Sequence, residues 1–176
     1  MTNHTHLLVT GPTGEAISSF MQFLGRRYVP YINFKYDRSG TLWEGRFKAS
    51  LVDTENYFLM VMRYIELNPV RANMVEMPDQ YRWSSYCHNV GTKTISFIVE
   101  HPIYRGLGKD SESRQRAYRH LFESSLSEKS VKQITQAWLS GTPLGSEKFC
   151  ERVETQLERK IGQMRRGRPR KIKKGL

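Results

Sequence analysis

The stretch that decides the fold reads DTENYFLMVMRYIELNPVR and occupies residues 53–71. Asp53 or Thr54 is a good N-terminal cap for a helix, and the residues from there to Pro69 include no glycine or other proline. The apolar and aromatic residues of this run recur at intervals of three and four, which predicts one helix that ends before Pro69, followed by a short helical segment over residues 69–75. The residues on the repeating positions are Tyr57, Phe58, Val61, Tyr64, Ile65 and Asn68.

Tyr64 and Asn68 are four residues apart and therefore lie on one face of this helix. An amide oxygen is a plausible ligand for a hard metal ion, and a tyrosine oxygen is a competent nucleophile once a cation lowers its effective pKa. The alternative is structural: Tyr64 would be a core residue, and the Asn-Pro pair would only stop the helix.

A second pattern of interest stands at the beginning of the chain, where Thr5 separates His4 from His6. Residues 6–10 are β-compatible and mostly apolar, which predicts a short strand that the Gly-Pro-Thr-Gly sequence at 11–14 breaks. In a strand, residues i and i+2 point to the same face, so the two imidazoles can converge on one ion. Taken alone, such a pair near a terminus is more often exposed to solvent than bound to metal.

The remaining patterns predict a mixed fold and three regions. A helix is expected from Glu15 to about Tyr28, with Pro30 disturbing its end, and a strand over residues 41–52 with an irregularity at Gly45. Three helices are expected over residues 113–124, 128–138 and 146–160. The expected organisation is a catalytic core at 1–90, a helical region at 91–160 and a disordered basic tail at 161–176.

Composition limits the function classes. The net charge of +11 is mostly a property of residues 159–176, which hold nine Lys or Arg and no acidic residue; the remaining chain has 19 basic and 17 acidic residues. The longest apolar run has six residues, so no membrane span is expected, and no signal peptide is apparent. Cys87 and Cys150 stand alone and predict neither a disulfide framework nor a zinc site, which favours a reducing cytoplasm.

The basic tail contains the sequence Arg-Gly-Arg-Pro-Arg-Lys at residues 166–171, which resembles the core of an AT-hook. Such a segment suits the narrow minor groove of A·T-rich duplex DNA. The alternative is a tail that raises affinity for any phosphate backbone. In both cases the expected DNA-binding residues are Arg166, Arg168, Arg170 and Lys171.

Four motifs occur in the order in which one family has them: MTNHTHLL (1–8), SGTLWEGRFKAS (39–50), RYIELNPVRA (63–72) and YRWSSY (81–86). Together they resemble the REP-associated tyrosine transposases, relatives of the HUH single-tyrosine insertion-sequence transposases. The resemblance is dense over residues 1–90. It implies an α+β fold, in which a small antiparallel sheet carries the histidines on a central strand and packs against helices.

The resemblance also implies a site and an activity. His4 and His6 would be the histidine pair, Tyr64 the nucleophile and Asn68 a further ligand of a divalent ion, Mg²⁺ or Mn²⁺. The expected activity is cleavage and rejoining of single-stranded DNA beside hairpins in repetitive elements, through a 5′-phosphotyrosine. The protein is expected to be a bacterial cytoplasmic, nucleoid-associated monomer.

This chain departs from the family pattern in two places. Thr5 stands where a large hydrophobic residue is usual, and some fifty residues that usually precede the histidines, with two strands and a helix, are not present. We therefore expect an N-terminally truncated core. A catalytically inactive copy that only binds nucleic acid is the main alternative function, and an RNA-binding regulator is a weaker one.

Further contacts with DNA are expected around these motifs. Arg46, Lys48 and Arg71 are candidates for phosphate contacts. The aromatic residues that could stack on unpaired bases are Trp43, Phe47, Trp83 and Tyr86. For Phe47 and Trp83 we prefer the alternative, packing in the core.

Overall fold

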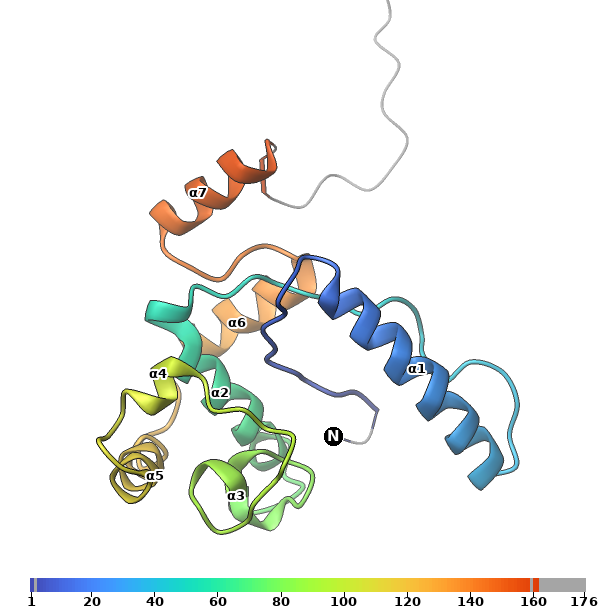
Figure 1. Cartoon of the computed structure of the whole chain (residues 1–176), viewed down its shortest axis with the longest axis horizontal. Coiled ribbons are helices and arrows are strands. Elements are labelled where there is room, and N and C mark those ends of the chain that lie inside the picture. Colours follow the sequence, from blue (N-terminus) through green and yellow to red (C-terminus); the bar gives the residue numbers. More distant parts are fainter. Residues whose placement is uncertain (2, 159, 162–176) are drawn as a thin grey trace, which may run out of the picture.

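The computed structural model describes residues 1, 3–158 and 160–161. In this part of the chain all regular elements are helices (Figure 1). They are α1 (Ala16–Lys35), α2 (Thr54–Arg71), a 3-10 helix η1 (Pro78–Gln80), α3 (Tyr86–Asn89), α4 (Pro102–Arg105), α5 (Ser111–His120), α6 (Glu128–Ser140) and α7 (Glu147–Leu157).

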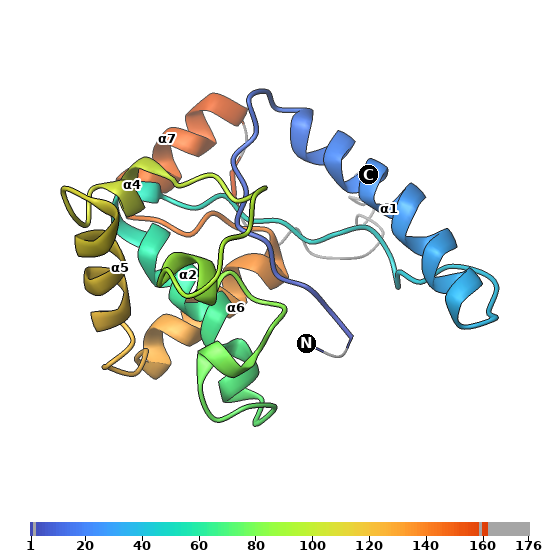
Figure 2. The same ribbon diagram turned by 60° about the horizontal axis from the view of Figure 1, so that its bottom comes forward.

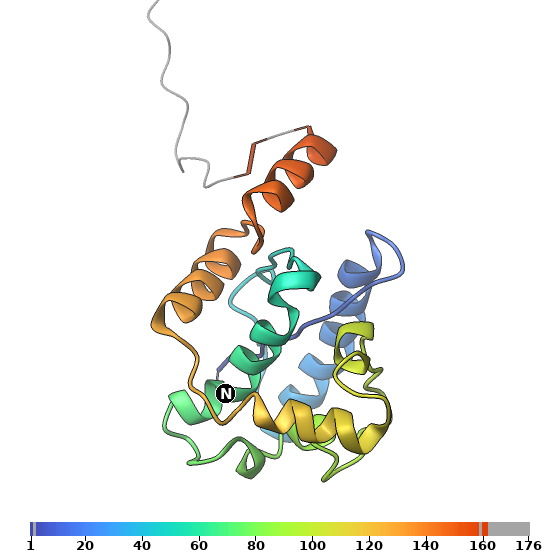
Figure 3. The ribbon, with the colours of Figure 1, turned by 90° about the vertical axis from the view of Figure 1, so that its left-hand side faces the viewer.

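Helix α2 is central to the packing. It begins after Asp53, as its sequence predicts, and lies in contact with α4 on one side and α6 on another (Figure 3). Its apolar residues have the 3.6-residue period of a helix, so they can face both neighbours. The buried residues of α2 are Phe58, Val61, Tyr64, Glu66, Asn68 and Pro69.

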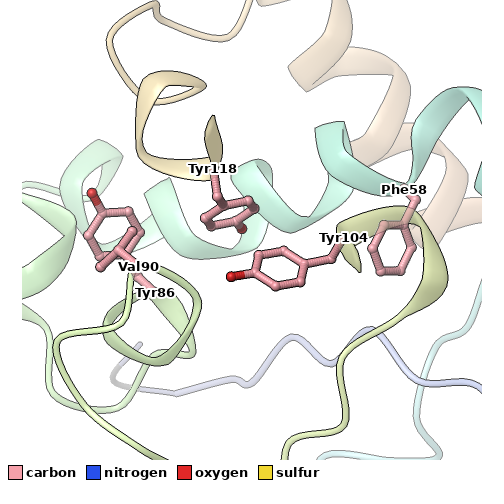
Figure 4. Close-up of a cluster of buried hydrophobic side chains, with 5 residues drawn as sticks. All are labelled: Phe58, Tyr86, Val90, Tyr104 and Tyr118. Atoms are coloured by element: carbon pink, nitrogen blue, oxygen red, sulfur yellow. The ribbon is translucent and has the colours of Figure 1, made fainter. Parts of the chain in front are cut away.

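The first core cluster joins α2 to the helices that follow it. Its buried members are Phe58 of α2, Tyr86 of α3, Val90, Tyr104 of α4 and Tyr118 of α5, and Figure 4 shows the Phe58 ring beside that of Tyr104. Tyr118 is fully buried, and its ring meets that of Tyr104 edge to face at 5.3 Å. Burying such rings is the main source of stability in a helical assembly of this size.

The second cluster joins α2 to α6. Val61 and Tyr64 pack against Ile134 and Ala137 of α6 and against Leu144 beyond it. Ser127 caps the start of α6 by accepting a hydrogen bond from the Ser130 N–H, and Gly141 ends it in a left-handed conformation (φ 72°) that glycine adopts without strain.

A carboxyl group is buried beside the first cluster. Glu66 is only 1% exposed; its Oε1 accepts hydrogen bonds from Ser85 Oγ at 2.5 Å and Asn89 Nδ2 at 2.8 Å. Its Oε2 accepts one from the Tyr118 hydroxyl at 2.8 Å. Three donors from two other parts of the chain therefore fix this face of α2.

The predicted antiparallel sheet is absent, and this prediction is wrong. Within the described residues the segments 6–10 and 41–52 are extended in part, but they form no strand, because a strand requires backbone hydrogen bonds to a neighbour. The sole strand-like pairing found there is an isolated parallel bridge between Val52 and Leu144, in which Asp53 N donates to Leu144 O and Leu144 N to Leu51 O, each at 2.8 Å.

Two helix ends also differ from expectation, because proline interrupts neither helix. α1 continues through Pro30 to Lys35, and α2 continues through Pro69 to Arg71. Beyond Pro69, Ala72 N donates to Asn68 O, so the hydrogen-bonding pattern resumes after the one bond that proline cannot make. The three predicted C-terminal helices are confirmed as α5, α6 and α7, with shifted ends.

The N-terminal segment crosses between α1 and the α2–α6 pair (Figures 1 and 2). Leu8 packs against both core clusters and so attaches this segment to α2. On the described residues no helix is long and apolar enough to cross a membrane.

Candidate active site

Tyr64 lies in the middle of α2 and faces α6. It is 5% exposed, and its hydroxyl is 3.3 Å from Thr135 Oγ1. The indole N–H of Trp138 also donates to this hydroxyl, at 3.4 Å. Both contacts are long for hydrogen bonds, so the hydroxyl is surrounded by α6 but weakly held.

The histidine pair lies beside this tyrosine. The ring centroids of His4 and His6 are 5.1 Å apart, and the His6 ring is 5.7 Å from that of Tyr64 and 5.5 Å from that of Trp138. Within this segment His6 and Leu8 are partly buried, whereas His4, Thr5 and Leu7 are exposed. Leu8 packs against both core clusters, and the His6 ring lies beside Tyr64 of α2 and Trp138 of α6.

The two imidazoles differ in their surroundings. Partial burial, aided by the neighbouring His4 and the N-terminal ammonium, lowers the pKa of His6 below its ordinary 6.5, so this ring is neutral at pH 7. His4 Nδ1 lies 2.7 Å from the amide oxygen of Asn3, to which it can donate a hydrogen bond.

Asn68 and Arg71 complete the face of α2 that carries Tyr64. Asn68 is 8% exposed, and its Nδ2 is buried without a hydrogen-bond partner among the described residues. A buried amide N–H without a partner is costly and marks a place where a hydrogen-bond acceptor is expected. The Arg71 guanidinium lies over the Tyr64 ring, 5.6 Å from its centroid, which places a positive charge beside the hydroxyl-bearing ring.

Of the three ligands predicted for a divalent ion, the structure places the His4 and His6 rings side by side, with centroids 5.1 Å apart. No group of three or more His, Cys, Asp or Glu suited to metal occurs among the residues described, so a site here must use another donor type. Two imidazoles and the oxygen of a buried amide are such a set, and imidazole ligands favour Mn²⁺ over an all-oxygen Mg²⁺ site.

Two residues of this site were not predicted. Thr135 and Trp138 reach the Tyr64 hydroxyl from α6, more than seventy residues further along the chain. The helical period over residues 128–138 predicts α6, but nothing in it indicates which helix α6 would contact. Lys48 also belongs here, because its Nζ lies 5.7 Å from the Trp138 ring centroid.

The other predicted DNA contacts are scattered. Arg46 is exposed, and Trp43 is 40% exposed. Core packing, preferred for Phe47 and Trp83, is wrong: they are 45% and 75% exposed. Tyr86 is buried in the first cluster and unavailable for stacking. The tail residues Arg166, Arg168, Arg170 and Lys171 lie outside the described residues.

The histidine pair, the tyrosine and the asparagine all lie in one stretch that is similar to known proteins. Residues 1–68 match the family model of the IS200-like transposases. The match ends at Asn68 and covers less than half of the chain, so it relates the N-terminal part of the protein, with its candidate site, to transposases. No curated protein and no solved structure gave a significant match.

Proposed function

We propose that this protein is a DNA transposase that cuts and rejoins single-stranded DNA through Tyr64. The observation that carries the proposal is the proximity of His4, His6 and Tyr64, which come from segments almost sixty residues apart. The match of residues 1–68 to IS200-like transposases supports the same reaction class.

The covalent step is a transesterification. The phenolic oxygen of Tyr64 loses its proton and forms a bond to phosphorus, while the bond from phosphorus to the 3′-oxygen breaks. The 3′-oxygen takes up a proton, leaving a 3′-hydroxyl and a 5′-phosphotyrosine. This ester keeps the energy of the phosphodiester, so another 3′-hydroxyl can reverse the step without a nucleotide cofactor.

The residues around Tyr64 have complementary roles. His4, His6 and Asn68 would hold Mg²⁺ or Mn²⁺, which when bound supplies a Lewis acid for a non-bridging phosphate oxygen. Arg71 lies over the Tyr64 ring, where its charge would attract the scissile phosphate. Lys48 supplies a second cation at the edge of the site.

The substrate follows from the resemblance of the four motifs. We propose hairpin-bearing repetitive DNA as the target, a monomer as the acting species, and contact of the basic tail with AT-rich duplex DNA. Arg46 is proposed as a phosphate contact outside the site.

The test is formation of a covalent adduct. The full chain, incubated with Mn²⁺ and a labelled single-stranded oligonucleotide that contains a hairpin, should give a species that survives denaturing electrophoresis. Tyr64→Phe should abolish it, and EDTA should do so for the unchanged protein. Tyr57→Phe, on the same helix, is the control and should retain it. An adduct that persists in Tyr64→Phe would overturn the proposal.

A specific observation favours a second candidate. Tyr64 is 5% exposed and its hydroxyl contacts α6, so a phosphate cannot reach it unless α6 shifts. The alternative is therefore a nucleic-acid-binding protein that does not cleave. It predicts oligonucleotide binding with no adduct at any metal concentration, in the unchanged protein as well as in Tyr64→Phe.

A further inference from the structure

Helix α1 is unlike every other long helix in the described part of the chain, because none of its twenty residues is buried. Phe20, Phe23, Arg27, Tyr31 and Phe34 follow one another at intervals of three and four residues. At about 100° per residue these positions form a narrow stripe along one side of the helix. In Figures 1 and 2 the helix lies at the edge of the molecule, across the N-terminal segment from α2.

The rings of this stripe, here called the α1 aromatic stripe, face solvent. Phe20 is 45% exposed, Phe23 60%, Tyr31 53% and Phe34 91%. Single exposed aromatics are ordinary, but a continuous row of them marks an interaction surface.

Cations accompany the rings. Arg27 lies over the Phe23 ring at 5.2 Å from its centroid, and Lys35 lies over Tyr31 at 5.7 Å. No acidic residue occurs in α1, and Arg26 adds a third positive charge. Two copies of this helix would repel each other, whereas a polyanion would be attracted.

A second row of rings extends the surface. Tyr28 is stacked on Trp43, with centroids 6.1 Å apart and an interplanar angle of 29°. Both are more than a third exposed. Flat rings beside cations are what a single nucleic-acid strand requires, since its bases stack on aromatic faces and its phosphates pair with Lys and Arg.

We propose that the α1 aromatic stripe binds a single-stranded nucleic acid, with Phe23, Tyr31 and Phe34 stacking on unpaired bases and Arg27 and Lys35 contacting phosphates. The inference rests on the proposed function for the choice of DNA as the strand. It assigns a binding surface that shares no residue with the Tyr64 site.

The test measures affinity. Fluorescence anisotropy of an oligothymidine of about 15 nucleotides with the full chain should show that Phe23→Ala/Phe34→Ala weakens binding about tenfold or more, because one stacked base contributes about 1–3 kcal/mol. Both side chains are exposed, so the fold should persist, as circular dichroism would verify. Phe97→Ala, which removes a ring that is 84% exposed elsewhere, is the matched control and should leave affinity unchanged.

Three outcomes would overturn the inference. One is equal affinity of the double variant and the unchanged protein for oligothymidine. Another is a double variant that binds oligothymidine as the unchanged protein does but no longer binds anionic phosphatidylserine vesicles, which would make the stripe a membrane contact. The third is a double variant that binds oligothymidine normally but has lost a dimer that the unchanged protein forms in analytical ultracentrifugation, which would make the stripe a contact between copies of the chain.

Failure of the proposed function is distinguishable from failure of this inference. If Tyr64→Phe and the unchanged protein both form no adduct, while the double variant loses oligothymidine binding, the stripe binds a strand but Tyr64 does not cleave it. If the unchanged protein forms an adduct and the double variant keeps full affinity for oligothymidine, Tyr64 cleaves DNA but the stripe does not bind it.

Discussion

The two sides of α2 differ in how completely their polar groups are satisfied. On one side Glu66 accepts three hydrogen bonds of 2.5–2.8 Å from Ser85, Asn89 and Tyr118. On the other side the Tyr64 hydroxyl has two contacts of 3.3 and 3.4 Å, and the Asn68 amide nitrogen has none within the described residues. The Glu66 side is built as a fixed support, and the Tyr64 side is left with capacity for a ligand.

The largest expected effect is on the Glu66 side. Glu66→Ala should lower the free energy of unfolding by about 3 kcal/mol, because it leaves the donors of Ser85, Asn89 and Tyr118 buried without an acceptor. Urea denaturation measures this. Glu55→Ala, at an exposed position of the same helix, should change stability by about 0.5 kcal/mol or less. If the two variants lost the same free energy of unfolding, the hydrogen bonds of Glu66 would not stabilise the fold.

The same carboxyl should make stability depend on pH. Burial raises the pKa of Glu66 from 4.5 to about 7, against the opposing influence of its three hydrogen bonds. Between these values the folded protein keeps a proton that the unfolded chain has lost, so stability should fall as pH rises from 4.5 to 7, by about 3 kcal/mol at most. Glu66→Gln cannot titrate and should abolish this slope. A slope that persists in Glu66→Gln would assign it to other groups.

A smaller effect compares one hydroxyl from each side. Tyr118→Phe removes a 2.8 Å hydrogen bond to a carboxyl in a fully buried place and should cost about 1–2 kcal/mol. Tyr64→Phe removes only the two long contacts and should cost about 0.5 kcal/mol. Thermal unfolding of both variants gives the comparison. If Tyr64→Phe were the more destabilising, Tyr64 would be a structural tyrosine.

Local signals predicted five of the helices, α1, α2, α5, α6 and α7, although not all of their ends. The spacing of apolar residues in 53–71 and in 128–138 is a property of neighbouring residues, and α2 and α6 begin where this spacing indicates. The pairing of His6 with Tyr64 was expected from the resemblance of the motifs, and the rings do meet.

Two strands were predicted from β-compatible residues in 6–10 and 41–52, and the sheet from the resemblance of the motifs; both predictions are wrong. A strand depends on a partner elsewhere in the chain, and the one bridge formed among the described residues pairs Val52 with Leu144. Trp138 and Thr135 were not predicted for the same reason, since local sequence patterns do not indicate which distant helices contact each other. The effect of proline on α1 and α2 was overestimated, because each proline removes only one hydrogen bond from a helix of 18 or 20 residues.

The most direct measurement locates the covalent bond. After reaction of the full chain with single-stranded hairpin DNA and Mn²⁺, nuclease and protease digestion followed by mass spectrometry should find a nucleotide on the peptide that contains Tyr64. A nucleotide found instead on another tyrosine, such as the exposed Tyr31 of α1, would contradict the assignment of Tyr64 as the nucleophile beside His4 and His6.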